Sequence, residues 1–176
     1  DCTGHGVPGA FMTMAVNAAL NHIASVMDIT DPVLVLQALH REMQAILHQD
    51  DMGESFENGF DAGVCYWAWN EPLLYFAGAR IDLYYQDPAT PTTLIRGNRT
   101  SLGYRQTDPD WTLFSRHDLE RIPGRTFYLT TDGLLDQAGG LKGHGFSRRR
   151  FQDVLQQGNG QPLPEQQAAL EQALAA

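Results

Sequence analysis

The sequence is poor in cysteine and contains no long apolar run. Its two cysteines, Cys2 and Cys65, lie far apart and outside any CxxC pattern. A disulfide framework and a structural zinc site are therefore disfavoured, and reduced thiols in a cytosolic setting are the default. No apolar stretch is long enough to cross a membrane, and no secretion signal is visible. We expect no membrane contact by this domain itself.

Basic residues are also scarce. Lys and Arg together number 12 against 21 Asp and Glu, which gives a formal net charge of −9. Because surfaces that bind nucleic acid are normally basic, general nucleic-acid binding is disfavoured. The hydrophobic content of 43% is ordinary for a globular protein, and 176 residues suffice for one domain with a core. We therefore expect a single domain over residues 1–176.

The most informative stretch is the opening segment, DCTGHGVPGAF. Its pattern predicts the end of a strand at Asp1, a glycine-rich turn, and a helix with Pro8 in its first turn. A carboxylate followed by open backbone suits a hard divalent metal ion, with main-chain carbonyls as further oxygen ligands. A phosphate-binding loop is the alternative, because helix N-termini attract anions. The Walker pattern is absent, however, and Asp1 would repel a bare phosphate.

Hydrophobic periodicity indicates helices at both ends of the chain and strands between them. Asp31 and Pro32 are expected as the N-cap and first residue of the second helix. This order is typical of an α+β fold with antiparallel pairing. The helices are expected at 8–27, 31–47, 147–156 and 164–175, an acidic loop at 49–58, and the strands at 60–69, 73–77, 81–85, 92–95, 111–115 and 126–131.

Three side-chain groups on these helices are most simply structural or solvent-exposed. In the first helix Val16, Leu20 and Ile23 recur at helical spacing, with Phe11 and Met14 widening the apolar stripe, so this face is expected to be buried. On the second helix His40 is read as a surface or structural residue. The run 148–150, three arginines, is most simply a solvated face, and docking of an acidic partner is the alternative.

A second stretch, TTDGLL, repeats the arrangement of strand, aspartate, glycine and helical turn. Taken alone, Asp132 is more simply a helix cap. Two carboxylates that end different strands of one sheet can converge on a shared cleft, however, and oxygen ligation suits Mg²⁺ or Mn²⁺. Asp1 and Asp132 together therefore predict a metal site.

Six blocks occur in one order along most of the chain: DCTGHGVPGAFMT, NGFDAGVCYWAW, LLYFAGARIDLYY, NRTSLGY, FYLTTDGLLDQ and GHGFSRRRFQDVL. Each block is weak, but their order resembles the SpoIIE/RsbU-type branch of the PP2C-like (PPM) protein phosphatases. The resemblance implies an αββα sandwich of two antiparallel sheets flanked by helices, with two divalent cations, Mn or Mg, at one end. Family acidic residues before the Asp1 block and near the C-terminus lie outside this chain. We expect the sandwich and the metal centre to be incomplete at both ends.

By matching position, the resemblance also implies roles for single residues. Asp1 would bridge the two metal ions, the main-chain carbonyl of Cys2 would ligate one, and Asp132 would ligate the other. Water would attack phosphorus directly, without a phospho-enzyme. His5 would either protonate the leaving serine oxygen or be a structural turn residue. Asp61 would either orient the attacking water or cap a strand.

The substrate class implied by the resemblance is phosphoserine or phosphothreonine on a partner protein, typically a STAS-domain anti-sigma-factor antagonist in a partner-switching pathway. The competing hypothesis is a non-catalytic PP2C-like module that binds such a partner. Retention of Asp1 and Asp132 favours catalysis. A small-molecule sensor domain would explain the aromatic strands but not the two aspartate turns. Relatives suggest a homodimer through the two N-terminal helices.

The chain begins with aspartate inside a motif rather than with methionine. We therefore expect it to be part of a longer protein, so that absent targeting segments say little about the parent. The expected location of this domain is the cytoplasm, and membrane anchoring of the parent is left open.

Overall fold

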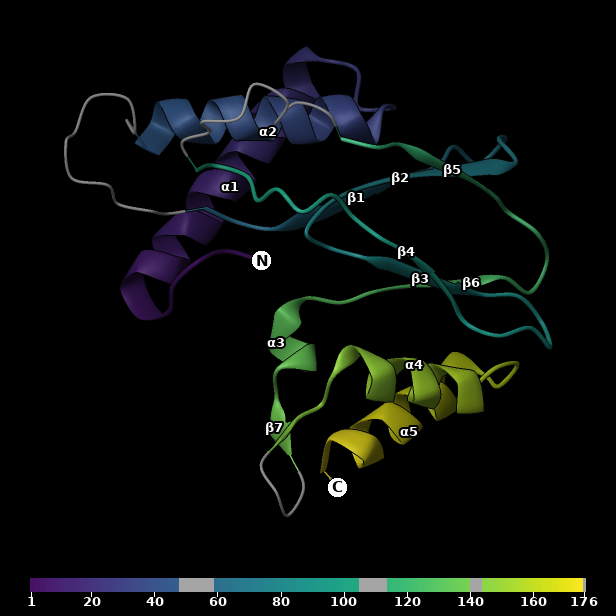
Figure 1. Cartoon of the computed structure of the whole chain (residues 1–176). Coiled ribbons are helices and arrows are strands. Elements are labelled where there is room, and N and C mark those ends of the chain that lie inside the picture. Colours follow the sequence, from purple (N-terminus) through teal and green to yellow (C-terminus); the bar gives the residue numbers. More distant parts are fainter. Residues whose placement is uncertain (48–58, 105–113, 140–143, 176) are drawn as a thin grey trace. The chain divides into compact units, whose positions relative to one another are not determined.

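The computed structural model describes residues 1–47, 59–104, 114–139 and 144–175. The chain divides into two compact units. The first, here called the N-terminal unit, comprises Asp1–Ile81 and Arg96–Glu120; the second, the C-terminal unit, comprises Asp82–Ile95 and Arg121–Ala176. Each unit contains a three-stranded antiparallel sheet with a pair of helices packed on it (Figure 1). The α+β class and the antiparallel pairing are thus confirmed.

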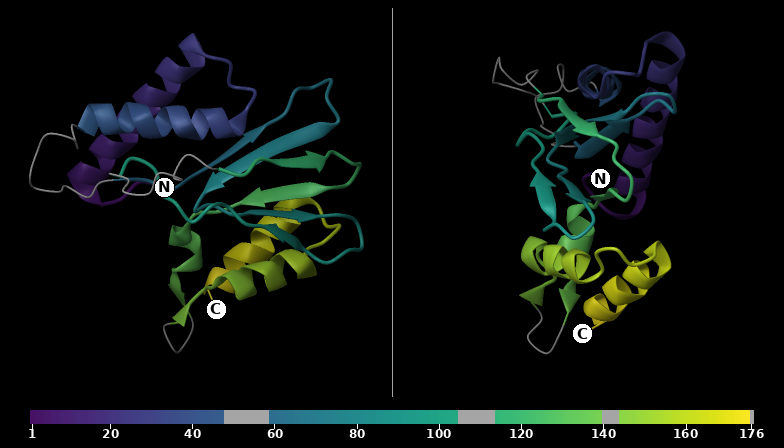
Figure 2. Two further views of the ribbon diagram at one scale, coloured as in Figure 1. Left: turned by 45° about the horizontal axis from the view of Figure 1, so that its top comes forward. Right: turned by 90° about the vertical axis from the view of Figure 1, so that its right-hand side faces the viewer.

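The N-terminal unit packs two helices against the sheet β1-β2-β5 (Figure 2). Pairing is antiparallel throughout, with Val64 of β1 opposite Ala77 of β2 and Leu74 of β2 opposite Leu119 of β5. The elements of this unit are α1 (Gly6–Val26), α2 (Pro32–Leu47), β1 (Ala62–Tyr66), β2 (Leu73–Ala79) and β5 (His117–Glu120).

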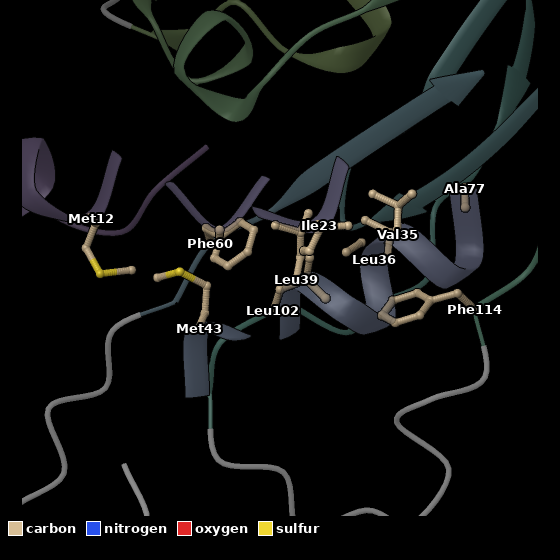
Figure 3. Close-up of a cluster of buried hydrophobic side chains, with 12 residues drawn as sticks. Met12, Ile23, Val35, Leu36, Leu39, Met43, Phe60, Ala77, Leu102 and Phe114 are labelled. Carbon is tan, nitrogen blue, oxygen red and sulfur yellow. The ribbon is translucent and has the colours of Figure 1, made fainter. Parts of the chain in front are cut away.

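Both N-terminal helices begin as the sequence predicts. The Asp31 carboxylate accepts a hydrogen bond from the Val33 N–H at 2.9 Å, which confirms it as the cap of α2. Figure 3 shows side chains from α1, α2 and the neighbouring strands gathered in one apolar cluster. Buried members include Met12, Ile23, Leu36, Leu39, Met43, Phe60 and Leu102.

The buried face of α1 differs from the predicted stripe. Ile23 is buried, but Leu20 is 40% exposed, Phe11 63% and Met14 71%. The core instead receives Met12 and Ala19, which are each 2% exposed. An apolar face of α1 is therefore left open to solvent.

The C-terminal unit has the sheet order β4-β3-β6, with Tyr84 of β3 opposite Leu94 of β4 and Tyr128 of β6. The ring of Tyr84 meets Phe151 edge-on, with centroids 5.1 Å apart, and Leu155 packs in the same cluster. The elements of this unit are β3 (Leu83–Gln86), β4 (Thr93–Ile95), β6 (Thr126–Leu129), α3 (Asp132–Leu135), β7 (Ala138–Gly139), β8 (His144–Gly145), α4 (Arg148–Gln157) and α5 (Leu163–Ala175).

The strand predicted at 111–115 is only partly covered by the described residues. Residues 111–113 lie outside the described residues, and Phe114 and Ser115 are not in a strand. The acidic loop predicted at 49–58 also lies outside the described residues. Phe114 is a buried core side chain, and the Ser115 N–H donates to the Asn98 side chain at 2.9 Å instead of to a ladder. Pairing with β2 begins only at His117. Within this stretch Phe114 therefore anchors the core, and the described strand starts further along the chain.

No helix in the described part of the chain combines the length and the apolar character needed to cross a bilayer.

Candidate active site

The chain start pairs with the segment that leads into β1. The backbone N–H of Asp61 donates to the Asp1 carbonyl at 2.8 Å, and the Asp1 nitrogen donates back to the Asp61 carbonyl at 2.8 Å. The Thr3 N–H donates to the Gly59 carbonyl at 2.9 Å, and Cys2 lies opposite Phe60. Asp1 and Asp61 thus form a hydrogen-bonded antiparallel pair, whose Cα atoms lie about 5.5 Å apart in regular geometry.

Side chains alternate between the two faces of this short ladder. Phe60 is 2% exposed in the apolar core, and Cys2 packs against the same cluster. Because successive residues of extended backbone point to opposite faces, Asp1 and Asp61 share the face that looks away from the core. The backbone therefore brings together two residues that the sequence placed sixty positions apart.

The carbonyl group of Cys2 is directed away from the ladder. The hydrogen bonds on either side of Cys2 and Phe60 make them a non-hydrogen-bonded pair, whose backbone groups point outward. The Cys2 carbonyl oxygen is therefore turned away from Phe60. The ladder between Asp1–Thr3 and Gly59–Asp61 does not use this oxygen as an acceptor.

A third segment, which contains Leu102 and Tyr104, pairs with Phe60 on the edge that faces away from Cys2. Phe60 exchanges two backbone hydrogen bonds with Leu102, at 3.0 and 2.8 Å. The Tyr104 hydroxyl lies 2.8 Å from the Thr3 hydroxyl, and the Tyr104 carbonyl accepts from the Gln44 side chain at 3.1 Å. A Cβ atom at Gly59 would lie 2.0 Å from the Tyr104 ring, so only glycine fits there. Helix α2 is thus linked through Tyr104 to Thr3, two residues after Asp1.

The glycine-rich turn carries the chain from the ladder into α1. Gly4 has φ +99° and Gly6 has φ +64°, values that favour glycine. A Cβ at Gly9 would lie 2.7 Å from the Gly4 carbonyl oxygen, so the turn closes tightly on the first turn of the helix. His5 is the N-cap residue of α1, and its side chain makes no capping hydrogen bond. Its two predicted roles therefore stay open.

Arg80 lies next to Asp61, and no sequence pattern points to a role for it. Its Nε atom is 3.7 Å from Asp61 Oδ2, with the arginine side chain 59% exposed and the aspartate 24%. Arg80 also has φ +57°, an uncommon backbone conformation for a residue other than glycine. Nothing in the block LLYFAGARIDLYY marks that conformation, so only the structure reveals it.

Asp132 lies in the C-terminal unit, as the first residue of α3. The N-cap of α3 is Thr131, and that side chain makes no capping hydrogen bond. Asp132 is exposed and follows β6 with two residues between. A Cβ at Gly133 would meet nothing closer than the Thr131 hydroxyl at 3.6 Å. Asp132 is therefore not the helix cap that was the simpler alternative, and its convergence with Asp1 stays a prediction.

The donors suit a hard cation in kind. The Asp1 and Asp61 carboxylates and the Cys2 carbonyl are all oxygen donors, which Mg²⁺ and Mn²⁺ prefer. Among the described residues no group of three or more His, Cys, Asp and Glu side chains is assembled. Mg²⁺ usually keeps several waters and takes only one or two protein carboxylates. The residues present therefore fit a hydrated divalent ion held by few side chains.

Comparisons with known proteins bear on the family and the fold of this chain. The sequence model of the family described as Stage II sporulation protein E (SpoIIE) matches residues 1–176. Among solved structures, the chain is similar to the SiaA-PP2C domain of Pseudomonas aeruginosa, with a TM-score of 0.83 and 37% sequence identity. That match covers 99% of this chain and 64% of that chain. No curated protein matches the sequence. The chain therefore belongs to the SpoIIE family and has the PP2C-like fold that its sequence predicts.

Proposed function

We propose that this chain is the catalytic domain of a metal-dependent phosphatase that removes phosphate from phosphoserine or phosphothreonine of a partner protein. Membership of the SpoIIE family and the likeness to a PP2C domain support the reaction class. The proposed partner is a phosphorylated STAS-domain anti-sigma-factor antagonist in a partner-switching pathway. That partner follows from the family resemblance.

The observation that carries this proposal is the antiparallel pair of Asp1 and Asp61. Two carboxylates directly opposite each other on one face repel and destabilise a ladder. Here they lie beside a main-chain carbonyl that the ladder leaves unused, that of Cys2. An arrangement that costs stability but gathers oxygen donors is expected at a functional site rather than in a scaffold.

Each residue of the candidate site would have its own role in the reaction. Asp1, the Cys2 carbonyl and Asp132 would hold two divalent cations, Mn²⁺ or Mg²⁺. When bound, these cations neutralise charge on the phosphoryl group and lower the pKa of water. Asp61, held by its backbone pairing with Asp1, would orient the attacking water by accepting a hydrogen bond. His5 would act as the general acid that donates a proton to the leaving oxygen.

The decisive experiment measures hydrolysis by the full-length protein with and without Mn²⁺. The substrates are p-nitrophenyl phosphate and a phosphoserine peptide. We expect Asp1→Asn and Asp132→Asn each to lower kcat/KM at least about 100-fold, since even outer-shell partners of metal ligands cost 10–100-fold. The matched control is Asp118→Asn, because Asp118 is an exposed aspartate of β5 that pairs with Arg116. Retained activity in the Asp132 variant would remove that residue from the site.

The alternative is a non-catalytic PP2C-like module that only binds the partner. It predicts no Mn²⁺-dependent hydrolysis by the unmodified protein, together with binding of the phosphorylated partner that survives both aspartate substitutions. Measuring both quantities on the same preparation separates the two functions.

We also propose that the N-terminal helices form a homodimer. The exposed apolar residues Val7, Phe11 and Met14 lie at positions i, i+4 and i+7 of α1, and are 83%, 63% and 71% exposed. Such a stripe on a helix is suited to pairing with a second copy. Sedimentation of the full-length protein tests this: Phe11→Glu should shift a dimer to monomer, and Leu163→Glu, on the exposed start of α5, should not. A monomeric unmodified protein would contradict it.

A further inference from the structure

Arg80 brings a positive charge to the acidic face formed by Asp1 and Asp61. Its Nε atom lies 3.7 Å from Asp61 Oδ2, which is longer than a hydrogen bond. Within the described residues Asp61 is the ionic partner of this guanidinium. Its side chain is 59% exposed, and the outer N–H groups of a guanidinium form a planar fork. That fork is therefore available to a ligand at the same face.

Backbone hydrogen bonds and close backbone approaches fix the conformation of Arg80. The Arg80 N–H donates to the Asn98 carbonyl at 2.8 Å, and the Asn98 N–H donates to the Gly78 carbonyl at 2.7 Å. A Cβ at Gly78 would lie 2.1 Å from the Ile81 carbonyl oxygen, and one at Gly97 would lie 2.3 Å from it. The close crossing of these segments thus fixes the Arg80 backbone with φ +57°.

An arginine at such a position is unusual in itself. Glycine adopts a positive φ without a steric penalty, whereas arginine does not. Strained backbone of this kind clusters at active sites and ligand clamps when the surrounding structure enforces it. The exposed ion pair between Arg80 and Asp61, at 3.7 Å, adds little to stability. The strained backbone of Arg80 is therefore better explained by a ligand that its side chain binds than by a gain in stability.

We propose that Arg80 binds the phosphoryl oxygens of a phosphomonoester at the Asp1–Asp61 face. This inference deepens the proposed function and rests on it. Two carboxylates on this face repel a phosphate dianion, and a guanidinium offsets that repulsion while matching the spacing of two phosphoryl oxygens. Asp61 then has a second role, since its carboxylate holds the arginine stem in place while the fork faces the substrate.

The test uses inorganic phosphate, the product, as the probe. Isothermal titration calorimetry of the Mg²⁺-loaded full-length protein compares the unmodified chain with Arg80→Gly and Arg80→Lys. Glycine relieves the backbone strain while removing the guanidinium, so Arg80→Gly is expected to stay folded. Loss of a charge-assisted contact should weaken phosphate binding about 10- to 100-fold. Lysine keeps the charge without the fork, so Arg80→Lys should fall between the two.

The matched control is Ala89→Gly. Ala89 has φ +59°, so this change relieves the same kind of strain without removing a charge, and phosphate affinity should not change. Mn²⁺ affinity, read by electron paramagnetic resonance, should be equal in all variants. In hydrolysis of p-nitrophenyl phosphate, Arg80→Gly should raise KM by a larger factor than it lowers kcat.

Three results would overturn the inference. These are unchanged phosphate affinity in Arg80→Gly, an equal loss in Ala89→Gly, or a loss of Mn²⁺ affinity that accounts for the loss of phosphate. The proposed function is tested separately. If the unmodified protein hydrolyses no phosphomonoester yet binds phosphate through Arg80, the proposed reaction fails and the arginine site stands. If hydrolysis occurs and Arg80→Gly binds phosphate normally, only the arginine site fails.

Discussion

His40 should make the N-terminal unit lose stability in mild acid. Its side chain is fully buried on α2, where Nδ1 accepts a hydrogen bond from the Gly103 N–H at 3.2 Å. Burial is the main reason that the pKa of His40 falls from 6.5 to about 4; the charge of Arg41 lowers it further, and a hydrogen bond with Gln44 opposes both effects. The folded protein therefore keeps this histidine neutral at neutral pH.

The loss of stability in acid follows from the difference between the pKa of His40 in the unfolded and in the folded chain. In the unfolded chain His40 is protonated below pH 6.5, whereas in the folded chain it stays neutral down to about pH 4. Stability is thus complete above pH 6.5 and is lost as the pH falls toward 4. One pKa unit corresponds to about 1.4 kcal/mol, so the whole loss is about 3 kcal/mol. Between pH 7.5 and pH 5 the loss from this residue is about 2 kcal/mol.

The assay is urea unfolding of the full-length protein at pH 7.5 and pH 5, followed by tryptophan fluorescence and circular dichroism. The test variant is His40→Asn, whose side-chain oxygen can accept the Gly103 hydrogen bond but does not titrate. The variant should lose about 2 kcal/mol less than the unmodified protein between the two pH values. The control is His22→Gln, a change at a histidine whose side chain is 57% exposed. An equal pH effect in His40→Asn would refute the reasoning.

Three other predictions concern packing and reactivity. Leu36→Ala should lower the free energy of unfolding by about 2–5 kcal/mol in urea titrations, because Leu36 is fully buried, whereas Leu34→Ala, at 48% exposure, should cost less than about 1 kcal/mol. Gly78→Ala should lower the melting temperature by several degrees, since its Cβ would lie 2.1 Å from the Ile81 carbonyl; an unchanged melting point would contradict the close crossing. Burial raises the pKa of Cys65 to about 11, so it should react slowly with Ellman's reagent at pH 8 until urea unfolds the protein.

The sequence predicted the helices well because their ends carry local signals. Asp31 caps α2 and Ser147 caps α4, where its hydroxyl accepts from the Arg150 N–H at 3.4 Å. Two arginines of the run 148–150 beside it make contacts within the C-terminal unit. Arg148 lies 3.3 Å from the Asp82 carboxylate, and Arg150 covers the ring of Phe146. Arg148 and Asp82 lie far apart in the chain, so the spacing of the arginine run does not predict their contact.

The candidate site was only partly predictable, for a physical reason. Sequence patterns marked Asp1 and Cys2, because the glycine-rich turn and helix start follow them directly. They did not show that Asp61 lies opposite Asp1, since strand register depends on contacts far apart in the chain. They also missed Arg80, whose conformation is enforced by Gly78 of the same segment and by Gly97 and Asn98 of another segment.

The Asp1–Asp61 pair makes a prediction that separates site from scaffold. In the absence of metal, two carboxylates directly opposite in a ladder repel, while Arg80 contacts only one of them. Asp1→Asn removes that repulsion and keeps the Arg80 contact with Asp61. In EDTA this variant should therefore be as stable as the unmodified protein or more stable, by up to about 1 kcal/mol.

Divalent cations should reverse that order. A ligand that binds only the folded state adds stability in proportion to its affinity, so Mn²⁺ should raise the unfolding midpoint of the unmodified protein. Asp1→Asn should lose most of this gain, whereas Asp118→Asn, a change at an exposed aspartate of β5, should keep it. A variant that is destabilised in EDTA and still gains fully from Mn²⁺ would show that Asp1 acts in folding and holds no metal. Opposite effects in the two buffers are what a carboxylate retained for ligation, at a cost to the fold, must produce.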